Sequence, residues 1–323
     1  MRAVQLKEFG GPEVLIPAEH PDPVPGPGEV VIDVAYVDTI FVETQIRAGR
    51  GRDHFPVTPP YVPGGGVSGV VRVVGAGVPA EWLGRRVSSF VTGSCAERAV
   101  APVSALTAVP DPLDLLPAAA LVHDGVTALG LLGLTALGET DRVLALGASG
   151  GMGTLLVQPT QARGARVIAV ARGEEKLALV RELGADAAVD ATRDDWAASA
   201  RHALGGRSRG RTSCWTGWAV PWAPPPSPSR PTVAASPRTE RRREVSHPLD
   251  TEDAARRAIG LFGIADVQFD PADLNRLTSE AHTTAATGRL RPVIGGVFPL
   301  ARAAEAHAAI EGRGLVGKVM LRV

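Results

Sequence analysis

The chain has 323 residues, with 34 basic and 34 acidic side chains and a mean hydropathy of +0.08. A formal net charge of zero gives no reason to expect a nucleic acid or a membrane surface as a partner, and no apolar run reaches the ~18 residues of a membrane span. The two cysteines, Cys95 and Cys214, exclude a disulfide framework and a zinc site built from several cysteines. The N-terminus lacks an apolar signal core, so we expect a cytoplasmic protein, long enough for two domains.

The first 120 residues consist of short strand-like runs separated by Gly and Pro. Clear examples are residues 29–34, 67–74 and 85–91. Frequent turn signals at this spacing predict a compact, barrel-like all-β domain. Residues 117–137 then have the apolar pattern of a helix.

Residues 141–173 have the pattern strand, glycine turn, helix, strand. Val143–Leu146 is a short apolar run, four glycines follow within residues 147–153, a helical pattern covers 154–163, and 165–171 is apolar again. This order is typical of the mononucleotide-binding unit of a doubly wound sheet. Glycines let the backbone approach a diphosphate, and the helix N-terminus offers N–H groups to it.

The residue that ends the second strand of this unit indicates which dinucleotide is bound. NAD enzymes usually place an acidic residue there for the ribose hydroxyls, whereas this chain has Arg172. Arg172, with Lys176, would pair with a 2′-phosphate. Glu174 and Glu175 oppose this interpretation, but acids are favoured in the first turn of the next helix anyway. The alternative for Arg172 is a solvated loop cation; we predict NADP(H).

Pro159 lies inside the predicted helix that follows the glycine turn. A proline there removes a backbone hydrogen bond and costs ~3 kcal/mol or kinks the helix. We therefore expect an irregular helix or an error in the sequence.

Residues 207–243 differ in composition from the rest of the chain. Three of the five tryptophans lie within 215–222, seven prolines within 221–237 and eight arginines within 207–243. Taken literally, this is a disordered or linker-like segment, because proline is not accepted in central strands. Codons compatible with residues 211–218, read from their third base, instead give Asp-Val-Val-Leu-Asp-Gly-Val, a buried strand and a turn.

The same offset gives a helical string for 222–226 and a strand entry for 232–237. We therefore hypothesise compensating frameshifts spanning about 207–245. The alternative is a genuine low-complexity insert, in which case two strands beside the nicotinamide are lost. Resequencing the coding DNA decides between the two.

The regular pattern returns after about residue 251. Residues 259–269 are apolar and predict an edge strand, 271–288 a helix, 293–298 a strand, 299–311 a helix and 319–323 a final strand. Lys318, just before that strand, is a candidate for contact with the cofactor phosphates; the alternative is an ordinary surface lysine.

Motifs spread over nearly the whole chain except about 207–245 resemble those of one family. The chain resembles the zinc-free quinone oxidoreductase branch of the medium-chain dehydrogenase/reductase superfamily. The similar blocks are 9–15, 25–30, 63–71, 84–87, 125–128, 147–153, 183–186, 288–292 and 317–319.

The resemblance implies an α/β protein with two domains. A GroES-like β-barrel domain covers 1–120 and is completed by about 270–323, and a Rossmann domain with a doubly wound parallel sheet covers 121–269. It also implies a homodimer formed by pairing the edges of the Rossmann sheets, which removes an exposed edge. The residues against the cofactor are then Thr127 and the turn residues Gly147, Ala148, Ser149, Gly150, Gly151, Met152 and Gly153.

Zinc-dependent relatives use a catalytic Cys and His and a four-cysteine lobe, none of which is present here, so we predict no metal site. Three positions are then candidates for catalysis. Asp38 stands where the family often has Asn, and His123 and Asp124 stand where it often has Gln. His123 is a candidate proton donor; the alternative is a packed or capping histidine.

We therefore predict an NADPH-dependent, zinc-independent reductase that transfers hydride to a small quinone or α,β-unsaturated carbonyl. Such acceptors need only hydrogen bonds and a proton as negative charge develops on them. The alternatives are an enoyl reductase dedicated to one pathway and a non-catalytic NADPH-binding protein. NADPH oxidation with a panel of quinones and enones separates these three.

Overall fold

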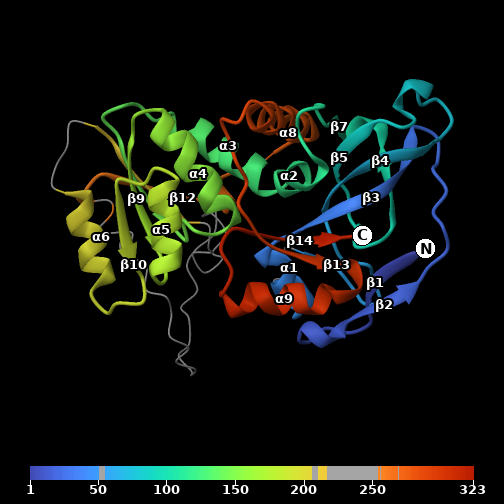
Figure 1. Ribbon diagram of the computed structural model, residues 1–323, viewed down its shortest axis with the longest axis horizontal. Coiled ribbons are helices and arrows are strands. Elements are labelled where there is room, and N and C mark those ends of the chain that lie inside the picture. Colours follow the sequence, from blue (N-terminus) through green and yellow to red (C-terminus); the bar gives the residue numbers. More distant parts are fainter. Residues whose placement is uncertain (51–54, 206–209, 217–253, 255, 268) are drawn as a thin grey trace, which may run out of the picture.

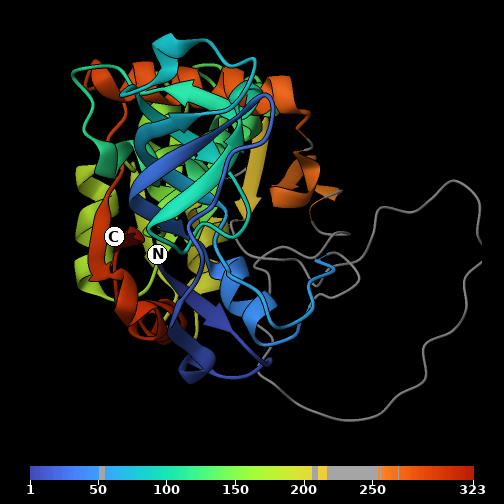
Figure 2. The same ribbon diagram turned by 90° about the vertical axis from the view of Figure 1, so that its right-hand side faces the viewer.

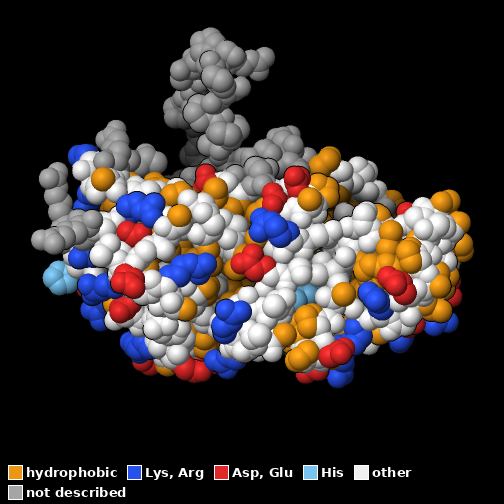
Figure 3. Space-filling view, turned by 90° about the horizontal axis from the view of Figure 1, so that it is seen from above, with side chains coloured by type: hydrophobic (Ala, Val, Ile, Leu, Met, Phe, Trp, Pro, Cys, Tyr) orange, Lys and Arg blue, Asp and Glu red, His pale blue; other side chains and the backbone are white. Residues whose placement is uncertain are grey.

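A computed structural model describes residues 1–50, 55–205, 210–216, 254, 256–267 and 269–323. The chain forms two bodies side by side, and both termini lie in the same one (Figure 1). No helix among these residues is long and apolar enough to cross a membrane. Acidic and basic side chains are interspersed on the face shown in Figure 3, as the balanced composition requires.

The first body is an antiparallel β structure around one apolar core. Its larger sheet has the order β13-β14-β3-β4-β5-β7, with β6 also pairing with β3, and β1 and β2 form a separate hairpin. Figure 2 views this body from its own side, with the blue and cyan strands in front. The strands are β1 (Arg2–Leu6), β2 (Leu15–Glu19), β3 (Glu29–Thr39), β4 (Gly66–Val74), β5 (Arg86–Phe90), β6 (Arg98–Pro102), β7 (Leu106–Ala108), β13 (Ile294–Pro299) and β14 (Lys318–Arg322).

The end of the chain is part of this N-terminal sheet. Strand β14 pairs antiparallel with β3, so that Met320 lies opposite Asp38. Helix α9 (Ala303–Gly312) packs on these C-terminal strands and on α1 (Phe41–Arg47). The apolar side chains of β14, including Val319 and Leu321, are buried in the same core as those of β3 and β4.

The second body is a parallel sheet of order β10-β9-β8-β11-β12 with helices on both faces. Alternate side chains of the strands bury against α4 and α5 on one face and against α6 on the other, as expected for a parallel sheet covered on both sides. The strands are β8 (Arg142–Leu146), β9 (Arg166–Ala171), β10 (Ala187–Asp190), β11 (Thr212–Thr216) and β12 (Ile259–Gly263), and the helices are α3 (Asp124–Thr135), α4 (Gly151–Ala162), α5 (Glu174–Glu182), α6 (Trp196–Leu204) and α8 (Pro271–Ala286). The predicted α/β architecture, an antiparallel β domain beside a doubly wound parallel sheet, is confirmed.

The interpretation of 207–243 as a linker is wrong for residues 212–216. These residues form β11, a central strand hydrogen-bonded to β8 and β12, with Cys214 and Trp215 buried. Thr and Trp have a high β propensity, and these residues form the strand between β8 and β12. Within the described residues, the buried indole nitrogen of Trp215 has no hydrogen-bond partner. The frameshift hypothesis starts from residues 211–218 and extends over 206–209 and 217–253, which lie outside the described residues, and it stays a prediction.

Two further expectations differ from the structure. Helix α4 continues through Pro159 to Ala162 without a break, because Leu155, Leu156 and Val157 are buried there and their packing outweighs one missing hydrogen bond. The helix predicted over 117–137 is two helices, α2 (Leu115–Ala120) and α3, with a turn at 121–123 between them. His123 in this turn is bonded to Asp38 of β3 through its backbone N–H as well as its ring.

Candidate active site

The glycine turn joins the C-terminal end of β8 to the N-terminus of α4. Gly147 has a φ of +66°, in the left-handed region, and Gly150 is the N-cap of α4. A Cβ on Gly153 would lie 2.5 Å from the carbonyl oxygen of Gly147 and 2.6 Å from Cα of Ala148, so only glycine allows the helix to start this close to the strand. The first-turn N–H groups of α4 have no acceptor within the helix. The turn residues therefore fit a diphosphate, as their pattern predicts.

Three basic side chains gather where β9 ends, beside this turn. The amine of Lys176 donates a hydrogen bond to the carbonyl oxygen of Arg313. Partial burial lowers the pKa of Lys176, and the nearby charges of Arg172 and Arg313 act in the same direction against the opposing effect of Glu175. Phosphate groups are commonly bound by such grouped cations, and the predicted contact of Arg172 and Lys176 with a 2′-phosphate stays a prediction. Arg172 and Lys176 were predicted from sequence; Arg313, which follows α9, was not.

Asp38 and His123 form the buried centre of a second group. The Asp38 side chain is fully buried, and its Oδ2 lies 2.9 Å from Nδ1 of His123. A carboxylate only accepts, so Nδ1 carries the proton. Burial opposes ionisation of Asp38, but the charge of Lys318 and the hydrogen bond from His123 outweigh it and lower the pKa of Asp38.

The ring of His123 is held between a strand and an aromatic side chain. A Cβ on Gly65 would lie 2.9 Å from Nε2, and one on Gly66 would lie 2.8 Å from Nδ1, so the two glycines leave the space that the ring occupies. Phe90 contacts the ring edge to face, with centroids 4.7 Å apart, and is itself 46% exposed. Within the described part of the chain no hydrogen-bond partner is seen for Nε2, and the His123 side chain is 13% exposed.

Lys318 joins Asp38 to Asp124. Its Nζ lies 2.6 Å from Asp38 Oδ1 as an ion pair and donates a 2.7 Å hydrogen bond to Asp124 Oδ2. The Lys318 side chain is 3% exposed, so the interpretation as a surface lysine is wrong. Its ammonium contacts the two carboxylates, and its contact with a cofactor phosphate stays a prediction.

This ionic network touches the glycine turn. A Cβ on Gly151 would lie 2.1 Å from Asp124 Oδ2 and 2.7 Å from Cδ of Lys318. The residue before Lys318 is bonded to the turn as well, since Gly317 N donates to the Ser149 carbonyl over 2.6 Å. The predicted residues Asp38, His123, Asp124 and Lys318 are thus brought together beside the predicted turn, while Arg172 and Lys176 lie where β9 ends.

Two further residues lie near His123. Thr127 is nearly buried and donates its hydroxyl to the His123 carbonyl, one helical turn back; its predicted contact with the cofactor stays a prediction. Glu43, not predicted, accepts the Ile40 N–H at 3.1 Å, and burial raises its pKa to about 7, with a further contribution from Asp38. Its sequence position, three residues into a short helix, suggests only a capping role. Within the described part of the chain, no three His, Cys, Asp or Glu side chains are grouped to hold a metal ion.

Three family models match parts of this chain. Residues 26–111 match the family model "Alcohol dehydrogenase GroES-like domain", and 151–208 and 223–321 match two models described as "Zinc-binding dehydrogenase". The chain is 29% identical over 340 residues to the human quinone oxidoreductase, covering 99% of this chain and 97% of the relative. It is 32% identical over 210 residues to a 2-haloacrylate reductase from Burkholderia sp, covering 64% and 63%.

The solved structure of a mycobacterial protein complexed with NADPH superimposes with a TM-score of 0.81, at 27% identity and over 100% of both chains. Matches of this length cover the glycine turn, the sheet order and the return of the C-terminal strand to the first body. The chain is an oxidoreductase homologue that belongs to the medium-chain dehydrogenase/reductase superfamily, with quinone oxidoreductases among its relatives.

Proposed function

We propose that the protein is an NADPH-dependent reductase that transfers hydride to a quinone or an α,β-unsaturated carbonyl compound. The observation that carries the choice of cofactor is the cluster of Arg172, Lys176 and Arg313 beside the glycine turn. Three cations where β9 ends suit the negative charge of a 2′-phosphate. An enzyme specific for NAD usually has an acidic residue there, which binds the free ribose hydroxyl.

The relatives support this proposal. The mycobacterial neighbour, at 27% identity, is a complex with NADPH. The human relative is a quinone oxidoreductase, and the Burkholderia relative reduces 2-haloacrylate, an activated alkene. Both acceptor classes carry a conjugated double bond, which accepts hydride without a metal to polarise it.

The residues of the site can be given roles on this proposal. NADPH, when bound, supplies the hydride. The α4 N-terminus and the turn 147–153 hold the diphosphate, and Phe90 borders the space in front of His123. The Nε2 of a protonated His123 donates the proton that the reduced acceptor needs, and Asp38 keeps the ring oriented through Nδ1. His123 regains a proton from water, so the reaction consumes one hydride and one proton. We propose that no zinc takes part.

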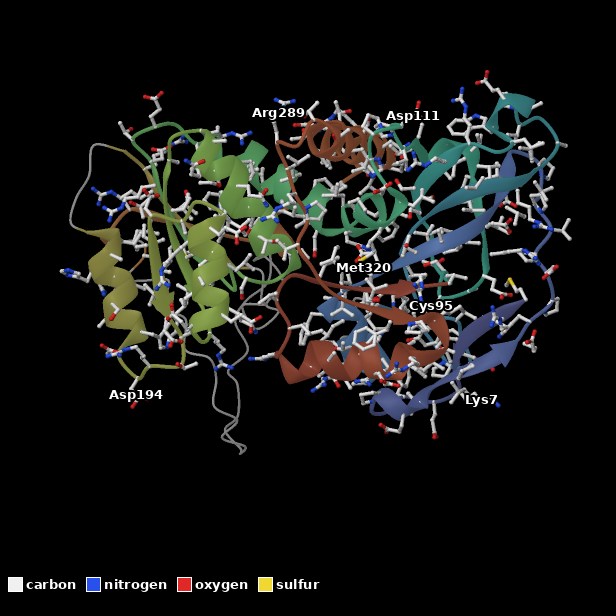
Figure 4. The ribbon with its side chains drawn as sticks, viewed as in Figure 1. Lys7, Cys95, Asp111, Asp194, Arg289 and Met320 are labelled. Atoms are coloured by element: carbon white, nitrogen blue, oxygen red, sulfur yellow. The ribbon has the colours of Figure 1, made fainter. Side chains whose placement is uncertain are left out.

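Steady-state oxidation of NADPH and of NADH, with benzoquinone, naphthoquinone and cyclohexenone as acceptors, tests the proposal. We expect NADPH to be preferred, and Arg172→Ala to reduce the preference by about 10- to 100-fold, which is the loss of one charge-assisted contact. Arg289→Ala, an exposed arginine at the top of Figure 4, is the matched control. Equal use of NADH, unaffected by Arg172→Ala, would contradict it, and tight NADPH binding without turnover would favour a non-catalytic protein.

We also propose a cytoplasmic homodimer that pairs through β12. This strand ends the order of the five described strands in its sheet, so its outer edge has no strand partner within the described part of the chain. An open edge is usually paired or covered. Light scattering on the purified protein gives the mass of the assembly, and a monomer at micromolar concentration would contradict the proposal.

A further inference from the structure

Lys318 is a buried cation whose position the proposed reaction does not explain. Its side chain is 3% exposed and enters from β14, between Asp38 of β3 and Asp124 at the start of α3. Removing an ammonium group from water is costly unless close carboxylates compensate. Both carboxylates lie within 2.7 Å of Nζ, so they supply the counter-charges that a buried ammonium group needs.

The charge of Lys318 bears directly on the His123 ring. Asp38 uses one oxygen for each cation: Oδ1 faces Lys318 Nζ at 2.6 Å, and Oδ2 faces His123 Nδ1 at 2.9 Å. A fully buried carboxylate favours the charged form of a histidine bonded to it, and a second cation on the same carboxylate weakens that preference. A proton donor, however, has to lose its proton in every turnover.

We propose that Lys318 is a positioning residue for proton donation: it neutralises Asp38, and so lets the His123 ring give up its proton and regain it during turnover. The inference rests on the proposed reductase function, in which His123 is the donor. Lys318 does not touch the acceptor in this proposal and acts through Asp38 alone.

Four charged groups surround the His123 ring. Asp38 comes from β3, Glu43 from α1 and Lys318 from β14, and Asp124 adjoins the ring on its own segment. Gly65, Gly66 at the start of β4 and Phe90 at the end of β5 contact the ring and carry no charge. Asp38, Asp124 and Glu43, when ionised, favour the protonated ring, and Lys318 is the one cation among these groups that opposes them.

The expected size of the effect follows from the shared carboxylate. Both cations touch the same carboxylate group, so they lie on the order of 6 Å apart, and at an effective dielectric constant of about 20 removal of Lys318 should raise the proton affinity of the ring by about 10- to 100-fold. The titration midpoint of His123 should therefore move to higher pH in Lys318→Met.

Histidine Cε1–H resonances, followed by NMR as a function of pH in the apoprotein, measure this shift without any activity. His123→Gln identifies the resonance. Lys7→Met is the matched control, because Lys7 is exposed at the outer edge of the first body, away from Met320 on β14 (Figure 4). The alkaline limb of the pH–rate profile should move by the same amount.

Lys318→Met leaves two buried carboxylates and can lower the yield of folded protein, so Lys318→Met with Asp124→Asn is the second variant. It removes one charge of each sign and keeps the Asp38–His123 pair; because the loss of Asp124 lowers the proton affinity of the ring, a smaller upward shift is expected. A His123 midpoint that moves no more than in Lys7→Met, in both variants, would overturn the inference. Because this readout needs no turnover, it is independent of whether the reductase proposal itself holds; absence of reductase activity, by contrast, would overturn only that proposal.

Discussion

Glu43 allows the electrostatics of the site to be tested through protein stability. Its carboxyl accepts the Ile40 N–H and lies close enough to Asp38 and His123 to interact with both charges. Burial, which disfavours the charged form, raises its pKa from 4.5 to about 7. An acid with a raised folded-state pKa stabilises the folded protein only while it is protonated there.

The sign and size follow by linkage. Below pH 4.5 the carboxyl is protonated in both states, so its burial has no ionisation cost, and as the pH rises to about 7 the unfolded chain ionises first and becomes relatively favoured. The pKa difference corresponds to about 3 kcal/mol of unfolding free energy. Because Glu43 is partly accessible, we expect a loss of about 1–3 kcal/mol between pH 5 and pH 8.

Urea unfolding of the wild type and of Glu43→Gln, followed by circular dichroism from pH 5 to 8, measures this loss of unfolding free energy. The glutamine keeps an oxygen for the Ile40 N–H but has no charge. The unfolding free energy of the variant should therefore increase relative to that of the wild type as the pH rises. Glu8→Gln, which replaces an exposed carboxyl, is the control and should show no such trend. A constant difference between Glu43→Gln and wild type over this range would refute the assignment of burial as the cause.

Further predictions concern backbone space and the buried pair. Gly153→Ala places a Cβ 2.5 Å from the Gly147 carbonyl oxygen, so cofactor binding, measured by fluorescence titration, should weaken at least tenfold and the melting temperature should fall. Gly133→Ala, in α3 with nothing within 4 Å of its Cβ, should instead raise the unfolding free energy by about 1 kcal/mol; a loss there would show that the position is not open. Asp38→Asn should lower kcat for quinone reduction by 10²-fold or more, since His123 loses the carboxylate that orients it; unchanged kcat would remove His123 from the mechanism.

Local sequence patterns predicted most helices and strands of the fold. The glycine turn between two apolar runs predicted β8, α4 and β9, because helix and strand periodicities are read over a few residues. They failed where packing overrides local preference. Residues 212–216 belong to a Pro- and Arg-rich segment that predicts a linker, yet they pair with β8 and β12 on either side, and the helix predicted over 117–137 is interrupted where His123 is bonded to Asp38.

The site was predicted only in part, for the same reason. Asp38, His123, Asp124 and Lys318 were each picked out, but as separate candidates, since nothing in the sequence shows that residues 38, 124 and 318 meet. Glu43 and Arg313 carried no local signal, because a capping position and a helix end are common at the surface.

The amino-acid sequence by itself therefore determined the two-part α/β architecture, the glycine turn and the basic character of the segment where β9 ends. These depend on neighbouring residues and their periodicity. The tertiary structure decided that Lys318 is buried between two carboxylates, because only the pairing of β14 with β3 brings the end of the chain against α3 and the glycine turn. Charges far apart in sequence acquire their effect on one another through distance and burial, and both are set by the fold.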